Sequence, residues 1–196
     1  FGAKNVNSTI RSNPPNGLLG VNIGPNKDSK DKLNDYLVCL KIFHDIADYI
    51  TINISSPNTE NLRDFHDQKK FEKLISSIVQ KMKELKSNTP IVVKISPDIL
   101  NEQAAQISEI LLKYKIKAII VSNTTEGKRE KLLDVLKHQK GGLSGKPLEK
   151  KSNIFINRFY KILKDKIIII GAGGVDSGKS AYEKIINGAS LIQLYT

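Results

Sequence analysis

The sequence contains one cysteine, so the chain cannot form an internal disulfide. This usage fits a reducing compartment. Cys39 lies in an apolar helical pattern, and we expect it to be a small buried residue. No apolar run approaches the roughly 20 residues that a membrane-spanning helix requires. The 196 residues suffice for one sizeable core, so we expect a single domain over residues 1–196.

Basic residues outnumber acidic ones, with 31 Lys and Arg against 20 Asp and Glu and a formal net charge of +11. Such an excess can attract nucleic acid or an anionic membrane. The lysines are spread along predicted helices rather than packed into one block, Trp is absent, and no nucleic-acid recognition motif is present. We therefore interpret the charge as a solvated surface and expect no nucleic-acid partner.

Segments with the periodicity of strands alternate with segments of helical periodicity. Strands are expected at 17–24, 48–55, 91–95, 118–122, 167–170 and 191–196. Helices are expected at 31–46, 68–86, 101–114, 148–164 and 177–187, whereas 1–16 is expected to be a loop and 126–146 a long polar loop with at most one short helix. This alternation implies an α/β fold with parallel strands and right-handed crossovers. A doubly wound sheet and an incomplete (β/α)8 barrel, with about six of its eight strands, both fit.

Polar residues stand at nearly every predicted strand end. They are Asn22, Asn53 to Ser56, Lys94, Asn123 and Thr124, Gly173 and Gly174, and Tyr195 and Thr196. In a barrel all strand ends open to one mouth, so these groups could meet one ligand. An open sheet would bring together only those near its switch point, and the barrel is therefore favoured.

The stretch 50–59 shows this pattern most clearly. Its isoleucines alternate with Thr51, Asn53 and Ser55, although a strand covered on both faces is normally apolar throughout. An unpaired buried amide or hydroxyl costs about 1–3 kcal/mol, so these side chains need partners, which a polar ligand could supply. The strand breaks at Pro57, which leaves Ser56 and Asn58 in a turn just beyond it.

Lys94 interrupts a β-branched run near a strand end. It could be a snorkelling or edge lysine, but at the mouth of a buried strand we expect it to face an anion or an electron-rich ring. The amides of Asn22, Asn53 and Asn123 offer donor and acceptor together, which suits a uracil-like or flavin-like edge.

Ser56 lacks a good histidine partner. His44 lies at a helix end and His66 and His138 lie in polar stretches, so we expect all three to be solvated. A Ser-His-Asp hydrolase is therefore not expected. A serine without histidine can still accept a proton if its own proton passes to water.

Residues 173–180 match the phosphate-loop pattern, with Lys179 and Ser180 at its end, between an apolar strand and a helix. No strand ends in an Asp that could hold Mg²⁺, and such loops usually open their domain rather than end it. The glycine pair at a helix start still suits a phosphate, which we interpret as that of a cofactor.

Several segments together closely resemble the signature of class 2 dihydroorotate dehydrogenases. They are 20–24 (GVNIG), 53–59 (NISSPNT) with Leu62 and Arg63, 93–98 (VKISPD), 122–125 (SNTT), 141–148 (GGLSGKPL), 171–178 (GAGGVDSG) and 193–196 (QLYT). The match covers nearly the whole chain in the family's order and approximate spacing.

The resemblance implies a (β/α)8 barrel that holds FMN, oxidises dihydroorotate to orotate in pyrimidine synthesis and passes electrons to a membrane quinone. It implies that Ser56 is the base that takes the C5 proton, while the C6 hydride goes to flavin N5. Class 1 relatives carry Cys at the position of Ser56. The implied substrate residues are Asn53, Ser56, Pro57, Asn58, Asn123 and Thr124. The implied FMN residues are Asn22, Asn53, Lys94 at the ring, Ser122, and Gly145, Gly174, Tyr195 and Thr196 at the phosphate end. No metal site is expected.

Two residues depart from the family pattern. Asn61 stands where the motif usually has Gly, and because Asn tolerates left-handed backbone well, we expect the turn to survive. Ala3 replaces an aromatic residue in a segment that resembles the end of a substrate-binding stretch. The family's N-terminal helices, first barrel strands and last helix have no counterpart. We therefore expect a fragment with an unclosed barrel that binds FMN weakly or not at all by itself.

By the same resemblance we expect peripheral association with the cytoplasmic face of a bacterial inner membrane, through an N-terminal segment outside this sequence. The mitochondrial inner membrane is the alternative. Two other functions remain open from the residues alone: a phosphate-loop nucleotide hydrolase that uses Lys179 and Ser180, and a non-catalytic basic barrel.

Overall fold

A parallel sheet forms the centre of the molecule. The computed structural model describes residues 2–127, 129, 132–133 and 135–195. Within them, six strands pair in the order β1-β2-β3-β4-β5-β6. Their bounds are β1 Gly20–Ile23, β2 Tyr49–Asn53, β3 Ile91–Lys94, β4 Ala118–Val121, β5 Ile168–Ala172 and β6 Leu191–Gln193. Every pairing is parallel.

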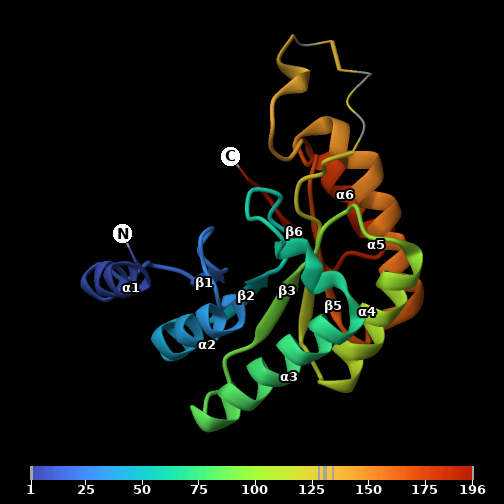
Figure 1. The fold of residues 1–196 in the computed structure, drawn as a ribbon. Coiled ribbons are helices and arrows are strands. Elements are labelled where there is room, and N and C mark those ends of the chain that lie inside the picture. The colour runs from blue at the N-terminus through green and yellow to red at the C-terminus, as the bar shows by residue number, and fades with distance from the viewer. Residues whose placement is uncertain (1, 128, 130–131, 134, 196) are drawn as a thin grey trace.

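The strand order decides between the two predicted architectures. The order in space equals the order along the chain, so the sheet is wound in one direction only, whereas a doubly wound sheet reverses its order midway. The sheet therefore forms part of a barrel, with helices along its outer side (Figure 1). The incomplete (β/α)8 barrel is confirmed, and the open-sheet alternative is wrong.

Helices link the strands and pack one against the next around the outside. They are α1 Ala3–Ser12, α2 Lys32–Phe43, α3 Gln68–Glu84, α4 Asn101–Lys113, α5 Glu149–Leu163 and α6 Gly178–Ile186. Short 3₁₀ turns occupy Leu62–His66, Val135–His138, Lys146–Leu148 and Lys164–Lys166. The helices expected from periodicity are confirmed within a few residues, as is one short helix in the long loop.

Helix α1 is the exception, because residues 1–16 were expected to be a loop. Its local sequence is rich in asparagine and it buries none of its residues. Contacts with neighbouring segments support it instead: Asn7 Nδ2 donates to Ile42 O at 2.6 Å, and Arg11 pairs with Asp45 at 2.6 Å. Such tertiary contacts override weak propensity. The prolines restrict only the chain after the helix has ended at Asn13.

The two faces of the sheet carry different side chains. The outer face packs against the helices through one large cluster that includes Ile52, Val93, Ile119 and Phe159. A smaller cluster of Val92, Ala118, Ile120 and Ala172 fills the inner face. Because strand side chains alternate, Lys94 shares the inner face with Val92, and Asn53 shares it with Thr51. These polar residues therefore point toward the barrel interior at the carboxyl ends of their strands.

The turn after β2 adopts the backbone conformation expected from the sequence. Asn61 has φ 53°, in the left-handed region, immediately before the 3₁₀ turn Leu62–His66. The expectation that Asn preserves this turn is confirmed. Cys39, which was expected to be buried, is only partly so.

We predict that Asn61→Val lowers the free energy of unfolding by about 1–2 kcal/mol, because a β-branched residue fits left-handed backbone poorly. Asn61→Gly should be neutral or slightly stabilising. Chemical denaturation measures both. The control is Asn88→Val, in a loop with ordinary backbone, which should change stability by less than about 0.5 kcal/mol. Equal losses at positions 61 and 88 would contradict the conformational explanation.

Candidate functional site

A cavity of about 580 Å³ opens at the carboxyl ends of the strands. This volume lies in the range of about 300–1,000 Å³ that small-molecule and cofactor sites occupy. Among its lining residues are eleven that the sequence predicted: Asn53, Ser56, Pro57, Asn58, Lys94, Ser122, Asn123, Thr124, Gly145, Gly174 and Tyr195. Convergence of the strand ends on one cavity is therefore found in the structure.

Two predicted residues are not among those that line the cavity. Asn22 is exposed on the edge strand β1, where it pairs in register with Thr51, two residues before Asn53. Thr196 lies outside the described residues. The lining also includes residues that sequence reasoning did not assign to the site, among them Ser144, Lys146, Asp176 and Gln193.

Three polar residues at or just beyond the carboxyl ends of β2 and β4 form a hydrogen-bonded cluster. Asn53 Oδ1 accepts from the Ser55 amide at 3.2 Å, from Ser55 Oγ at 3.1 Å and from Asn123 Nδ2 at 3.3 Å. Asn123 Nδ2 also donates to Ser55 Oγ at 3.0 Å. The protein itself therefore supplies the partners that these buried groups require. With its oxygen engaged, Asn53 has its N–H groups to offer to a ligand.

Ser56 lies in the turn after β2 and is partly exposed to the cavity. Its Oγ accepts the Asn58 backbone N–H at 3.2 Å, which holds the hydroxyl oxygen in one position. Among the described lining residues there is no histidine. The expectation that Ser56 is not part of a Ser-His-Asp arrangement thus agrees with the cavity's composition.

Lys94 is buried, with 4% of its surface exposed. Its Nζ donates to Gln193 Oε1 at 3.1 Å and to the Tyr195 hydroxyl at 3.0 Å, and it lies 4.6 Å from the centre of the Tyr195 ring. A snorkelling lysine would reach solvent, so that alternative is wrong. A buried ammonium whose described partners are neutral favours an anionic or electron-rich ligand beside it.

Glycines also line the cavity. Gly145 and Gly174 have φ values of 71° and 73°, a region that L side chains rarely adopt. A Cβ on Gly174 would lie 2.6 Å from the Glu149 backbone, so no other residue fits there. Glycine backbone in a cavity that Lys146 also lines suits a phosphate group.

The residues of the phosphate-loop pattern serve another purpose. Ser180 is buried, and its Oγ accepts the backbone N–H groups of Asp176 at 2.9 Å and Ser177 at 3.0 Å. Those are amides that a phosphate loop would direct at its nucleotide. Lys179 is exposed and is not among the cavity residues. Ser177 and Ser180 therefore cap the start of α6. This arrangement does not support nucleotide hydrolysis at the loop.

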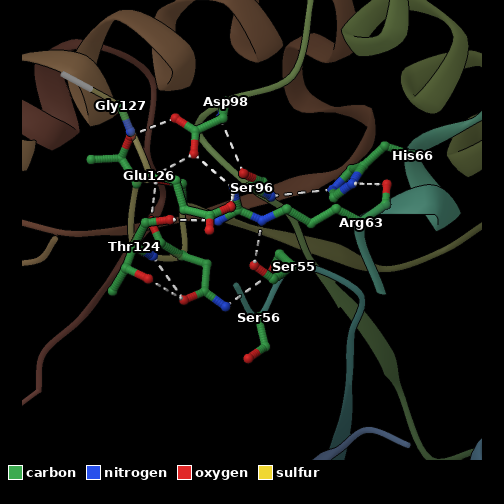
Figure 2. Close-up of polar contacts among 12 residues, drawn as sticks. Ser55, Ser56, Arg63, His66, Ser96, Asp98, Thr124, Glu126 and Gly127 are labelled. Atoms are coloured by element: carbon green, nitrogen blue, oxygen red, sulfur yellow. Dashed lines mark hydrogen bonds and ion pairs between the residues drawn. The ribbon is translucent and has the colours of Figure 1, made fainter. Parts of the chain in front are cut away.

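Charged residues behind the cavity form a network that sequence reasoning missed (Figure 2). Arg63 Nη1 pairs with Asp98 Oδ2 at 2.9 Å and with Glu126 Oε2 at 2.7 Å. Asp98 also accepts from Lys151 Nζ and from Thr125 Oγ1. Burial alone would raise the pKa of Asp98, but the bonds from Lys151, Thr125 and the Glu126 amide lower it to about 2. Arg63 and Asp98 both lie in the motifs quoted for the family resemblance, and this was the sequence signal that could have pointed to the network.

The long loop after β4 begins and ends at one point. Thr125 N donates to Leu143 O at 3.1 Å and Leu143 N to Thr125 O at 2.7 Å, which makes a short antiparallel bridge. Within the loop, Arg129 Nη1 donates to Gln139 O at 2.5 Å. Its base is thus fixed beside Thr124 and Gly142, both of which line the cavity.

His66 contradicts the expectation that it is solvated. It is 2% exposed; its Nδ1–H donates to Arg63 O at 2.8 Å, and its Nε2 accepts the Ser96 amide at 3.3 Å. The bond from Ser96 requires a neutral ring, because only an unprotonated Nε2 can accept it. Burial lowers the pKa of His66 from 6.5 to about 4. The polar neighbours in sequence suggested a surface position, but two backbone partners allow burial. His44 is partly buried, and only His138 is exposed as expected.

Comparison with known proteins identifies relatives over the whole chain. The family model described as Dihydroorotate dehydrogenase matches residues 2–196. A protein of Buchnera aphidicola subsp. Schizaphis graminum named dihydroorotate dehydrogenase (quinone) is 46% identical, covering 96% of this chain and 58% of that protein. A protein of the same name from Aliivibrio fischeri (strain MJ11) is 38% identical, covering 100% and 60%.

A solved structure shows the same fold. The crystal structure of DHODH from Eimeria tenella in complex with ferulenol superimposes with a TM-score of 0.88 at 31% identity, covering 98% of this chain and 57% of that one. The chain thus spans about three fifths of the length of the relatives it matches.

None of the helices in the described part of the chain combines the length and the apolar composition that a membrane-spanning helix needs.

We predict that His66 makes the protein sensitive to mild acid. The unfolded chain binds a proton at this ring below about pH 6.5 and the folded protein only below about pH 4, so stability is lost as the pH falls between these values. The shift corresponds to about 3 kcal/mol. Denaturation between pH 7 and pH 4.5 measures the loss, and Asp98 stays ionised in this window. His66→Gln should flatten the slope and His138→Gln should not; equal slopes in all three proteins would contradict the assignment.

Proposed function

The chain belongs to the dihydroorotate dehydrogenase family, and we propose on that basis that its cavity is where dihydroorotate is oxidised to orotate in pyrimidine synthesis. The carrying observation is that the amides of Asn53 and Asn123, the Ser56 hydroxyl and the Lys94 ammonium, which lie at or just beyond the carboxyl ends of β2, β3 and β4, line a single cavity. Asn53 and Asn123 suit the amide edges of a pyrimidine, and Ser56 lies beside them.

We propose that FMN occupies the remainder of the cavity. In this proposal Gly145 and Gly174 hold the phosphate through close backbone approach, Ser122 contacts the cofactor along its length, and the buried Lys94 ammonium lies at the ring. When bound, FMN supplies the acceptor for the substrate's hydride. Lys94 stabilises negative charge at that end of the cavity because little water screens it. Tyr195, which was expected at the phosphate end, instead accepts a hydrogen bond from the Lys94 ammonium through its hydroxyl.

We propose Ser56 as the general base that takes the C5 proton. The Asn58 amide fixes Ser56 Oγ and donates to it, which favours the deprotonated oxygen. Because Ser56 is partly exposed, its own proton can pass to water. The substrate ring is oriented by residues at the ends of two strands so that C5 faces this oxygen. They are Asn53, Pro57 and Asn58 at and after the end of β2, and Asn123 and Thr124 after β4.

A quinone is the proposed final electron acceptor, since relatives at 46% and 38% identity are named as quinone enzymes. A lipid-soluble acceptor requires contact with a membrane, and we propose peripheral association with the bacterial inner membrane for the full-length protein.

We predict that Ser56→Ala in the full-length protein lowers the rate of dihydroorotate oxidation by about 10²–10⁴-fold, the usual contribution of a general base. FMN should remain bound, as shown by visible absorbance of the purified protein. Ser76→Ala on the outer side of α3 is the matched control and should be fully active. Unchanged turnover in Ser56→Ala would remove Ser56 from this role.

We predict that Lys94→Ala weakens FMN binding by about tenfold to a hundredfold, because a charged hydrogen-bonding group in a buried position is lost. Titration of the flavin-free protein with FMN measures the dissociation constant. Lys117→Ala, at an exposed lysine just before β4, serves as control. An unchanged constant in Lys94→Ala would place the flavin ring elsewhere.

A further inference from the structure

We propose that Arg63 is a positioning residue for the oxidation step: its guanidinium holds the loop of Ser56 at a fixed place relative to the loop of Thr124. This inference rests on the proposed function, because it concerns the geometry between the proposed base and a proposed substrate residue. Arg63 does not line the cavity and so acts through the residues it contacts.

The guanidinium bonds directly to the backbone of both loops. Arg63 Nε donates to Ser55 O at 3.3 Å, and Nη2 donates to Thr124 O at 3.1 Å. Ser55 immediately precedes Ser56, and Figure 2 shows the Ser56 side chain pointing away from the network. One rigid, planar group therefore sets the separation of two loops that reach the cavity from β2 and β4.

Two carboxylates hold the guanidinium in its own place. Nη1 lies between Asp98 on the β3 loop and Glu126 on the β4 loop. Asp98 is in turn fixed by Lys151 from α5 and by the Glu126 amide at 2.9 Å. Two positive and two negative side chains balance here, so the network carries no net charge. We infer a geometric contribution because the guanidinium contacts the backbone of both loops.

The backbone of Arg63 is fixed as well. His66 Nδ1–H donates to Arg63 O, and His66 Nε2 accepts the Ser96 amide from the β3 loop. Both ends of Arg63 are thus tied to the loops after the central strands. A long side chain held at both ends loses little further freedom when the substrate binds, which is the condition for preorganisation.

Lysine cannot replace this arrangement. An ammonium carries its donors on one atom, whereas the two carbonyls and two carboxylates here are reached from three nitrogens of a planar fork. Arg63→Lys keeps the charge and most of the packing but releases at least one of the two loops. The expected result is a misplaced Ser56 in a folded protein.

The test compares Arg63→Lys with the unaltered full-length holoenzyme. Reduction of bound flavin by dihydroorotate is followed in a single turnover and expressed per bound flavin, with ordinary substrate and with substrate deuterated at C5. We expect the rate to fall about 100-fold, the cost of misplacing a reacting group by about 1 Å. The C5 isotope effect should rise because proton removal becomes slower relative to the other steps. Flavin content and melting temperature should stay near those of the unaltered enzyme.

Two further variants separate position from charge and from general destabilisation. Arg11→Lys makes the same change in an exposed ion pair on α1 and should leave rate and isotope effect unchanged. Glu126→Gln removes a half-exposed charge but leaves both carbonyl contacts, so the rate should fall less than about tenfold. A larger loss in Glu126→Gln would show that charge balance matters more than the carbonyl contacts, and would overturn the inference.

The remaining outcomes are also decisive. If Arg63→Lys loses flavin yet turns over normally per bound flavin, or keeps the isotope effect of the unaltered enzyme, Arg63 is only structural and the inference is wrong. If the unaltered holoenzyme shows no flavin reduction by dihydroorotate, the proposed function itself fails and the inference fails with it. The two failures are therefore distinguishable.

Discussion

The in-register pairing of parallel strands is the constraint on which the rest of this structure depends. The pairing places Asn53 opposite Lys94 at the carboxyl ends of β2 and β3. Because a shift of one residue would turn both side chains toward the helices, the apolar alternation that buries Ile52 and Val93 also fixes the polar groups in the cavity. Packing on the outer face and chemistry on the inner face are thus set by one register.

Periodicity predicted most of the fold because most elements bury one regular face. Helix α3, for example, buries a stripe from Phe71 to Met82 that is visible in the sequence. Helix α1 could not be predicted this way, since it buries none of its residues and is supported by single contacts such as Asn7 to the Ile42 carbonyl. Contacts between distant segments leave no mark in a local pattern.

Many cavity residues were predictable because polar side chains at the ends of apolar strands stand out, whereas others, such as Ser122 and Gly145, were predicted only by the family resemblance. The residues that hold the cavity loops in place could not be predicted in this way. Arg63, Asp98 and Lys151 look like ordinary surface charges, and His66 lies in a polar stretch, so nothing local shows that their partners come from other loops. Asn22 shows the opposite limit: it has the right residue type at a strand end, yet it lies on the edge strand and does not line the cavity.

The bridge between Thr125 and Leu143 has an evolutionary consequence. A loop closed at its base behaves as a separate insert, so residues can be added or deleted within it at little entropic cost and without shifting Thr124. Homologous proteins can therefore diverge in the length and sequence of this insert while the backbone at its base stays constant.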